Sequence, residues 1–214
     1  MEAALARDLA LEALLVREDV VSSPPITALM QRAARPPVIL GDRVFASIVD
    51  AETPQGIAAE IAIPHGKVRT DGDSVFLEGV QDAGNVGAII RSAAAFGLGT
   101  VYLDKGCADA WSPKVLRAAS GAHFALSLVQ AAQPPQSRLV CAVAHGGEAL
   151  SVADLSGRVC WVFGAEGRGV SSELQGKAVA TVTIPVAASV ESLNVAAAAA
   201  ICFYEAFSRR ARGS

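Results

Sequence analysis

Short apolar runs alternate with polar, turn-rich stretches over the last two-thirds of the chain. Five of these runs have the length and continuity expected of strands buried on both faces of a sheet: Ser74–Glu78, Thr100–Leu103, Leu139–Val143, Val159–Phe163 and Thr181–Ile184. Four intervening segments have helical features: Asn85–Phe96, Ser112–Ser120, a short helix starting over Ser171–Leu174, and Ser192 to about Arg210. This alternation predicts an α/β domain with a mostly parallel sheet covered on both faces.

Capping residues mark where these helices begin and end. Asn85 and Ser192 are residue types that accept hydrogen bonds from free backbone N–H groups, so each is expected to cap its helix. Ser112-Pro113 combines a capping serine with a proline suited to the first turn. Gly97 is expected to stop the helix that begins near Asn85.

A polar segment at Pro64–Asp73 separates this domain from a shorter first part. We expect a short N-terminal segment over residues 1–66 and a larger domain over residues 73–214. The first part is predicted to contain a helix over Ala3–Val16 and a strand over Ile57–Ile63.

The net charge and the spacing of cysteines and histidines bear on whether the chain binds nucleic acid or a metal. The chain has 214 residues and a net charge of −3, which argues mildly against a nucleic-acid partner. Its four cysteines and three histidines form no C-x-x-C pair and no cluster with the spacing of metal ligands, so no metal is expected. We expect the cysteines to be small buried residues and the histidines to be structural or surface residues.

No segment has the features of a secretory signal or a membrane span. Charged side chains within the first 21 residues interrupt any apolar core of a signal peptide, among them Arg7, Asp8, Glu12, Arg17, Glu18 and Asp19. The alanine-rich run Val195–Ile201 is too short to cross a bilayer. A cytoplasmic protein is therefore expected.

Three segments combine strand ends with polar or glycine-rich turns, where α/β folds bind ligands. In Leu77–Leu103, Arg91 is a lone cation within an apolar helix, and it is either a solvated residue or a group held for a phosphate. In Trp161–Val170, glycines surround Glu166, but the spacing matches neither G-x-G-x-x-G nor a P-loop. Ile184–Phe207 places Ser192 and Asn194 at the start of an alanine-rich helix.

Taken together and in order, these segments resemble the three signature motifs of the SpoU (TrmH-like) branch of the SPOUT RNA methyltransferases. The matching stretches are DAGNVGAIIRSAAAFG, FGAEGRG and IPV-x-x-SVESLNVA, and the resemblance extends over about Val75–Phe207. The segment Ser112–Ala122 also resembles the family. Ala83 and Ala196 depart from it, at positions where proline and serine are frequent, and neither change removes a functional group.

The resemblance implies a fold and a cofactor that residue spacing does not show. It implies that the C-terminal part threads through a loop as a trefoil knot, which is rare in proteins. It implies binding of S-adenosyl-L-methionine in the knot loops, at positions that correspond to Gly164, Ile184 and Leu193. It also implies a homodimer formed through the knotted region.

The same resemblance implies methyl transfer to a ribose 2′-hydroxyl of RNA, with polar active-site positions at Asn85, Arg91, Glu166, Ser192 and Asn194. The family's arginine is often assigned the role of base. A guanidinium stays protonated in nearly every protein setting, so we favour Arg91 as a two-pronged phosphate clamp whose charge lowers the pKa of the hydroxyl. The proton would then pass to a phosphate oxygen of the substrate.

The N-terminal segment carries a weaker resemblance. TPQGIAA, over Thr53–Ala59, is similar to the end of the ribosomal-protein-like RNA-binding domain of related enzymes, and what precedes it is shorter than a complete copy. This favours ribosomal RNA as the substrate, with transfer RNA as the alternative. A non-catalytic RNA-binding relative and a nucleotide-dependent oxidoreductase are two further hypotheses. The oxidoreductase is disfavoured because the dinucleotide fingerprint is missing.

Overall fold

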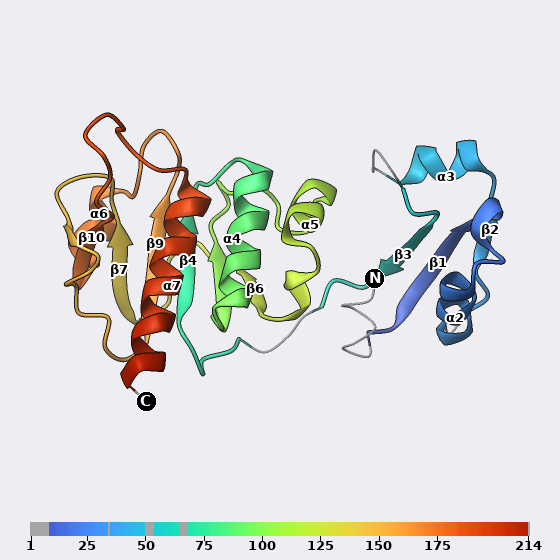
Figure 1. The fold of residues 1–214 in the computed structure, drawn as a ribbon, viewed down its shortest axis with the longest axis horizontal. Helices are drawn as coiled ribbons and strands as arrows, with labels where there is room; N and C mark the ends of the chain where they lie inside the picture. The colour runs from blue at the N-terminus through green and yellow to red at the C-terminus, as the bar shows by residue number, and fades with distance from the viewer. Residues whose placement is uncertain (1–8, 34, 50–53, 65–67, 214) are drawn as a thin grey trace. The chain divides into compact units, whose positions relative to one another are not determined.

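The chain forms two compact units, each with its own hydrophobic core (Figure 1). The units are Met1–His65 and Gly66–Ser214. The structure is a computed structural model that describes residues 9–33, 35–49, 54–64 and 68–213.

In its described residues, the first unit contains a three-stranded sheet, two α-helices and one 3₁₀ helix. Strand β1 lies between β2, to which it is parallel, and β3, to which it is antiparallel. The elements in chain order are β1 (Leu11–Arg17), η1 (Glu18–Val20), α2 (Pro24–Arg32), β2 (Val38–Leu40), α3 (Asp42–Ile48) and β3 (Ile57–Ile61).

The predicted helix over Ala3–Val16 is wrong where the structure describes it, because Leu11–Arg17 is strand β1. Its first residues, up to position 8, lie outside the described residues. Leucine, alanine and glutamate favour a helix locally, but pairing with strands on both sides buries Leu11, Leu14 and Val16 in the unit's core. Tertiary packing therefore overrides local propensity. The strand predicted over Ile57–Ile63 is confirmed as β3.

The second unit contains a seven-stranded sheet in the order β6-β5-β4-β9-β7-β10-β8, and every neighbouring pair is parallel. Its strands are β4 (Ser74–Glu78), β5 (Thr100–Leu103), β6 (Ser127–Gln130), β7 (Arg138–Ala142), β8 (Glu148–Ala149), β9 (Val159–Gly164) and β10 (Ala180–Thr183). Its helices are α4 (Ala83–Ala95), α5 (Pro113–Ala119), η2 (Ala122–Phe124), α6 (Ser172–Lys177) and α7 (Val195–Gly213). The predicted α/β fold with a mostly parallel sheet is confirmed.

All five predicted strands are present, with boundaries shifted by at most one residue. The central strand β9 is buried at every position, as an uninterrupted apolar run predicts for a parallel strand covered on both faces. Strands β6 and β8 were not predicted. The first has just two apolar residues between a serine and a glutamine, and the second has two residues in all, so neither carries a recognisable pattern.

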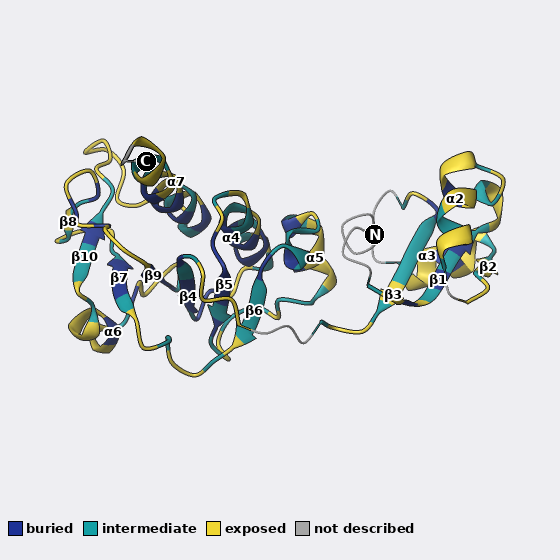
Figure 2. Cartoon of the chain, turned by 90° about the horizontal axis from the view of Figure 1, so that it is seen from below, coloured by how far each residue is buried: buried dark blue, intermediate teal, exposed yellow. Residues whose placement is uncertain are grey.

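Helices α4, α5 and α7 cover one face of the sheet, and α6 covers part of the other (Figure 2). Helix α4 buries residues spaced three and four apart, the pattern of a helix with one apolar face: Val86, Gly87, Ile89, Ile90 and Ala93. Gly87 lets α5 approach closely, because a Cβ at this position would lie 2.4 Å from the Cβ of Ala118. Gly97 follows the helix in a left-handed conformation, as expected.

The parallel arrangement brings the carboxyl ends of β4, β7, β9 and β10 to the same edge of the sheet. Ligands bind at this edge in α/β folds. The trefoil knot implied by the family resemblance stays a prediction. Among the described residues, no helix is both long enough and apolar enough to cross a membrane.

Candidate active site

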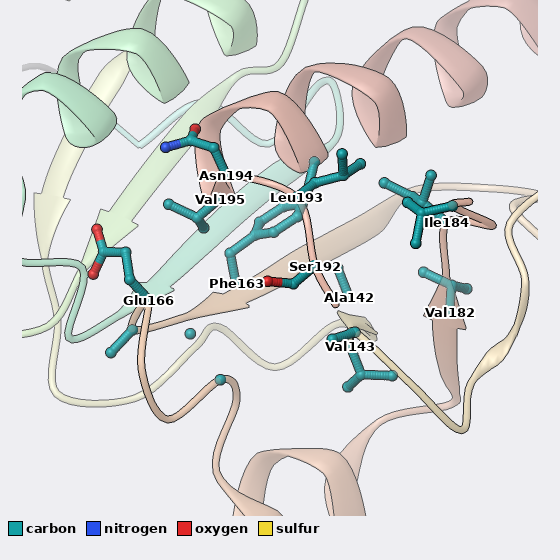
Figure 3. Close-up of a pocket in the computed structure, with 16 residues that line it drawn as sticks. Ala142, Val143, Phe163, Glu166, Val182, Ile184, Ser192, Leu193, Asn194 and Val195 are labelled. Atoms are coloured by element: carbon teal, nitrogen blue, oxygen red, sulfur yellow. The ribbon is translucent and has the colours of Figure 1, made fainter. Parts of the chain in front are cut away.

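A cavity of about 350 Å³ lies at the carboxyl edge of the sheet, between the segments that follow β7, β9 and β10. Figure 3 shows Glu166 and Asn194 at one end of this cavity and Val182 and Ile184 at the other. The cavity therefore has a polar end and an apolar end. Its walls are formed by Ala142, Val143, Ala144, Phe163, Gly164, Ala165, Glu166, Gly169, Val182, Ile184, Val186, Ser192, Leu193, Asn194, Val195 and Ala198.

The segment after β9 folds back tightly on itself next to the cavity. Ala165 and Gly169 form an isolated β-bridge, and the N–H of Gly169 donates to the carbonyl of Ala165 at 2.8 Å. A Cβ on Gly164 would lie 2.0 Å from the backbone of Gly169, so no other residue fits at position 164. Gly164 thus permits the turn that shapes this wall of the cavity.

The far end of the same segment is fixed to β4. The backbone N–H of Ser171 donates to Oε2 of Glu78 at 2.7 Å. The side-chain amide of Gln175 donates to the carbonyl of Val170 at 2.7 Å, and the hydroxyl of Ser171 caps α6 through the N–H of Leu174. The Ala165–Gly169 bridge and these bonds hold the segment that carries the exposed carboxylate of Glu166.

Asn194, rather than Ser192, caps helix α7. The helix begins at Val195, and Oδ1 of Asn194 accepts hydrogen bonds from the N–H groups of Ala196 at 2.9 Å and Ala197 at 3.2 Å. The prediction that the helix starts at Ser192 with that residue as its cap is therefore wrong. Ser192 is exposed and lines the cavity in the irregular segment that precedes α7.

Asn85 also has a different role from the predicted cap. Helix α4 begins at Ala83, and Oδ1 of Asp82 accepts the N–H of Asn85 at 2.7 Å, so Asp82 is the cap. The side chain of Asn85 is thereby left available for other partners. Sequence reasoning missed this because aspartate and asparagine cap helices about equally well, and both are present in the turn.

A chain of side-chain hydrogen bonds joins the three motifs. Nδ2 of Asn85 donates to Oε1 of Glu166 at 2.9 Å, and Nδ2 of Asn194 donates to Oδ1 of Asn85 at 2.9 Å. The backbone of α7 fixes the direction of this chain, because Oδ1 of Asn194 already accepts two N–H groups. Asn194 must then present its NH₂ group to Asn85, which must present its own NH₂ group to Glu166.

Arg91 lies outside this group. It does not line the cavity, and it is six residues beyond Asn85, about 9 Å along the axis of α4. Its side chain is exposed, and its Nη1 donates to Oγ of Ser120 at 3.4 Å. Within one chain, the structure therefore does not bring Arg91 together with the other predicted polar residues.

The predicted cofactor positions all lie on the cavity. Gly164, Ile184 and Leu193 line it, as do Glu166, Ser192 and Asn194 among the predicted polar residues, while Asn85 contacts two of these through hydrogen bonds. Sequence reasoning missed the wall formed by Ala142–Ala144. The strand before it was predicted, and its carboxyl end on the same sheet edge was the signal that could have located this wall.

The cysteines are reduced and have little nucleophilic character. Cys141, Cys160 and Cys202 are buried and Cys107 is half-buried. Burial raises the thiol pKa to about 11 for Cys160 and to about 12 for the other three. A thiol with such a pKa is almost entirely protonated at neutral pH, so none of the four is suited to covalent catalysis.

Neither of the two histidines that the structure describes lines the cavity. His123 is buried, its Nε2 lies 2.6 Å from the carbonyl oxygen of Ala110, and burial lowers its pKa. His145 is exposed, and His65 lies outside the described residues. No group of three or more histidine, cysteine or acidic side chains in the described part of the chain could hold a metal ion.

Comparison with known proteins shows that the chain is similar to ribosomal RNA methyltransferases. Residues 74–204 match the model of the SpoU rRNA methylase family. The chain is similar to the 23S rRNA (guanosine(2553)-2′-O)-methyltransferase RlmP of Bacillus subtilis, with 34% identity over 174 residues that cover 78% of this chain and 70% of the relative. It is also similar to the 23S rRNA (adenosine(1067)-2′-O)-methyltransferase of Streptomyces laurentii, with 38% identity over 153 residues that cover 66% of this chain and 54% of the relative.

The fold matches a solved structure over the whole chain. The SpoU methyltransferase AviRb from Streptomyces viridochromogenes, in complex with the cofactor AdoMet, superposes with a TM-score of 0.89 and 25% sequence identity. The match covers 100% of this chain and 88% of that one. With the motifs, the parallel sheet and the family match in agreement, the chain belongs to the SpoU rRNA methylase family.

Proposed function

We propose that this protein is an S-adenosyl-L-methionine-dependent RNA methyltransferase that methylates a ribose 2′-hydroxyl. The observation that carries the proposal is the chain of hydrogen bonds Glu166–Asn85–Asn194, which joins all three motifs at the polar end of a ligand-sized cavity. A structural scaffold alone has no need for three exposed or half-exposed polar side chains in this arrangement. The relatives in B. subtilis and S. laurentii, both named as ribose methyltransferases, support the same chemistry.

The residues around the cavity fit the cofactor. A volume of about 350 Å³ lies within the range of about 300–1,000 Å³ found for small-molecule sites. The apolar end, at Val182 and Ile184, suits a flat adenine ring. The small side chains of Ala142, Gly164 and Ala165 leave backbone N–H and C=O groups within reach of the polar parts of a nucleoside and an amino acid. Gly164, Ile184 and Leu193 would hold the cofactor.

Cofactor binding is directly measurable. Isothermal titration calorimetry on the purified protein should detect binding of both S-adenosyl-L-methionine and its demethylated product, because the cavity contacts proposed above do not involve the methyl group. Absence of heat at high micromolar cofactor, with the protein shown to be folded by circular dichroism, would count against the assigned cavity.

Bound cofactor supplies a methyl group made electrophilic by its sulfonium. The protein's own residues then have to hold the ribose and help its 2′-hydroxyl lose a proton. Glu166 and Asn85 would orient the substrate at the polar end of the cavity, and Ser192 and Asn194 would hold the segment before α7 and the ribose. Arg91, beyond the cavity, would bind a phosphate of the RNA backbone, and its charge favours ionisation of the nearby hydroxyl. A substrate phosphate oxygen would take the proton.

Ribosomal RNA is the favoured substrate, with transfer RNA as the alternative. Both relatives described above are named for positions in 23S rRNA. The first unit, with its separate core, would select the RNA by the shape of a folded region or an unpaired loop. We propose a cytoplasmic location together with this substrate.

We also propose that the protein acts as a homodimer. Helix α7 leaves three large apolar side chains substantially exposed: Ile201, Tyr204 and Phe207, at 40%, 55% and 48%. They are spaced three apart and lie along one side of the helix, and Phe96, the residue directly after α4, packs against the two aromatic rings. An exposed apolar stripe of this kind is typical of a buried interface. Light scattering that shows only a monomer at micromolar concentration would contradict the dimer.

The substrate RNA can be found by mapping ribose methylation in total RNA from cells with and without the gene. One 2′-O-methyl position in ribosomal RNA should disappear when the gene is deleted and return when the wild-type gene is restored. Loss of a position in transfer RNA alone would overturn the preference for ribosomal RNA. A ribose methylation map that does not change in any RNA would contradict the proposed activity.

A further inference from the structure

Ser120 has an unusual backbone conformation directly after α5. Its φ of 49° and ψ of 42° lie in the left-handed region, and it is the single non-glycine residue with a positive φ in the described part of the chain. Glycine is the usual residue at such a helix end because a Cβ is disfavoured there. The next residue, Gly121, also has a positive φ of 84°. A serine here needs a reason beyond chain geometry, since strained residues of this kind concentrate at functional sites.

The serine hydroxyl has two partners. Oγ of Ser120 donates to the carbonyl of Arg117 at 3.4 Å and accepts from Nη1 of Arg91 at 3.4 Å. The hydroxyl therefore links the last turn of α5 to Arg91 of α4. Within the described residues, this is the one hydrogen bond that the Arg91 side chain makes. A guanidinium has five N–H donors, so most of them remain available to a substrate.

Close packing between α4 and α5 supports the hydrogen bond between Ser120 and Arg91. Helices α4 and α5 pack so closely at Gly87 that a Cβ there would also lie 2.8 Å from the carbonyl oxygen of Val115. Val115 and Ala119 of α5 are fully buried against α4 and the sheet. The end of α5, and with it Ser120, is therefore fixed relative to the helix that carries Arg91.

We infer that Ser120 is a positioning residue for Arg91: its hydroxyl selects the side-chain conformation in which the guanidinium meets the RNA phosphate. This inference rests on the proposed function, because it assigns Arg91 to the substrate. Long side chains such as arginine lose conformational freedom when they bind, and a partner that restricts the side chain beforehand reduces that loss. Ser120 acts on RNA turnover through Arg91 and does not contact the cofactor cavity.

Two substitutions separate this role from a structural one. Ser120→Gly removes the hydroxyl and also relieves the backbone strain, so its thermal unfolding temperature should equal or exceed that of the wild type. Ser120→Ala removes the hydroxyl and keeps the strain. Both variants should lose about 3- to 30-fold in kcat/KM for RNA, less than the ~10²–10³ expected for loss of a preorganised charged group itself. The Kd for S-adenosyl-L-methionine should not change in either.

Ser112→Ala is the matched control, because it removes a serine hydroxyl from the opposite end of the same helix, where the hydroxyl makes no capping hydrogen bond. It should retain wild-type turnover. A double-mutant cycle tests the coupling between the two residues most directly. In a protein that already carries Arg91→Ala, Ser120→Gly should cause no further loss of kcat/KM for RNA.

Two results would contradict the inference. In the first, Ser120→Gly and Ser120→Ala both keep wild-type kcat/KM. In the second, Ser120→Gly lowers kcat/KM by the same factor whether residue 91 is arginine or alanine. Either result, with an active wild-type enzyme, leaves the proposed function intact. If the wild-type protein transfers no methyl group to ribosomal or transfer RNA, the proposed function itself is contradicted, and the inference with it.

Discussion

At the residue scale, Asn85 is central to the site because it both donates and accepts. Its NH₂ group donates to Glu166 and its carbonyl oxygen accepts from Asn194. Neither aspartate, which lacks the donor when ionised, nor alanine, which lacks both groups, can replace it. The residue type was predictable from the motif. Its partners, 81 and 109 positions away in sequence, were not, because no local pattern encodes which loops meet at a sheet edge.

Asn85→Asp should lower turnover at least tenfold at pH 8, because a carboxylate would face the carboxylate of Glu166. Two such groups raise the pKa of one of them, and the protonated acid regains an O–H donor. The ratio of variant to wild-type turnover should therefore rise as the pH is lowered from 8 to about 5.5. Asn85→Ala is the control and should show a ratio that does not depend on pH. A ratio that stays level for Asn85→Asp would contradict the hydrogen-bonded arrangement.

Arg91 is the second residue whose chemistry can be tested. Arg91→Ala should reduce turnover by ~10²–10³ and leave the Kd for S-adenosyl-L-methionine nearly unchanged, because Arg91 lies outside the cavity. Arg91→Lys should also lose most of the turnover, since an ammonium cannot make a forked contact with phosphate. Steady-state kinetics and calorimetry on the same preparations measure both effects. Near-normal turnover in Arg91→Lys would contradict the proposed two-pronged contact between Arg91 and a phosphate.

At the element scale, the segment between β9 and α6 shapes the cavity. Gly164→Ala places a Cβ 2.0 Å from the backbone of Gly169, so the turn must open. We expect binding of S-adenosyl-L-methionine to weaken at least tenfold, with a loss of stability of about 1–3 kcal/mol from overpacking.

Gly167→Ala in the same segment is the matched control for Gly164→Ala. A Cβ at position 167 would have no heavy atom within 4 Å, so cofactor binding and the thermal unfolding temperature should both stay near wild type. Calorimetry and thermal denaturation of the two variants, measured side by side, test the prediction. Equal cofactor affinity in both would show that the tight turn does not shape the binding site.

The elements that sequence patterns predicted best are the buried strands and the helices that cover them. β9 is an uninterrupted apolar run and β4 has a continuous apolar centre at Val75–Leu77, and a parallel sheet buries such runs on both faces. The sequence was least informative where propensity and packing disagree, as in β1, and where several capping residues compete, as around Asp82 and Asn194. The wall formed by the residues after β7 was missed because its small apolar side chains carry no chemical signal.

At the scale of the whole molecule, the negative net charge sets a limit on RNA binding. With a net charge of −3, long-range attraction to RNA is weak, so affinity has to come from local cations such as Arg91 and Arg168. The binding constant should fall with salt along a slope that reflects only a few phosphates. Fluorescence anisotropy with a labelled ribosomal RNA fragment measures this slope, and a steep slope, matching many phosphates, would contradict the account.

The division into two units leads to a separate prediction. A protein that begins at Gly66 keeps both core clusters of the second unit and the entire cavity. It should bind S-adenosyl-L-methionine with nearly the affinity of the full chain and bind RNA at least tenfold more weakly. Unchanged RNA affinity in the shortened protein would show that the first unit does not select the substrate.

The most direct test of the central claim is methyl transfer by the purified protein from radiolabelled S-adenosyl-L-methionine to ribosomal and transfer RNA, followed by digestion of the product to nucleosides. We expect the label to appear as a 2′-O-methyl nucleoside and Arg91→Ala to remove it. Label on a base instead of a ribose oxygen would contradict the assigned chemistry.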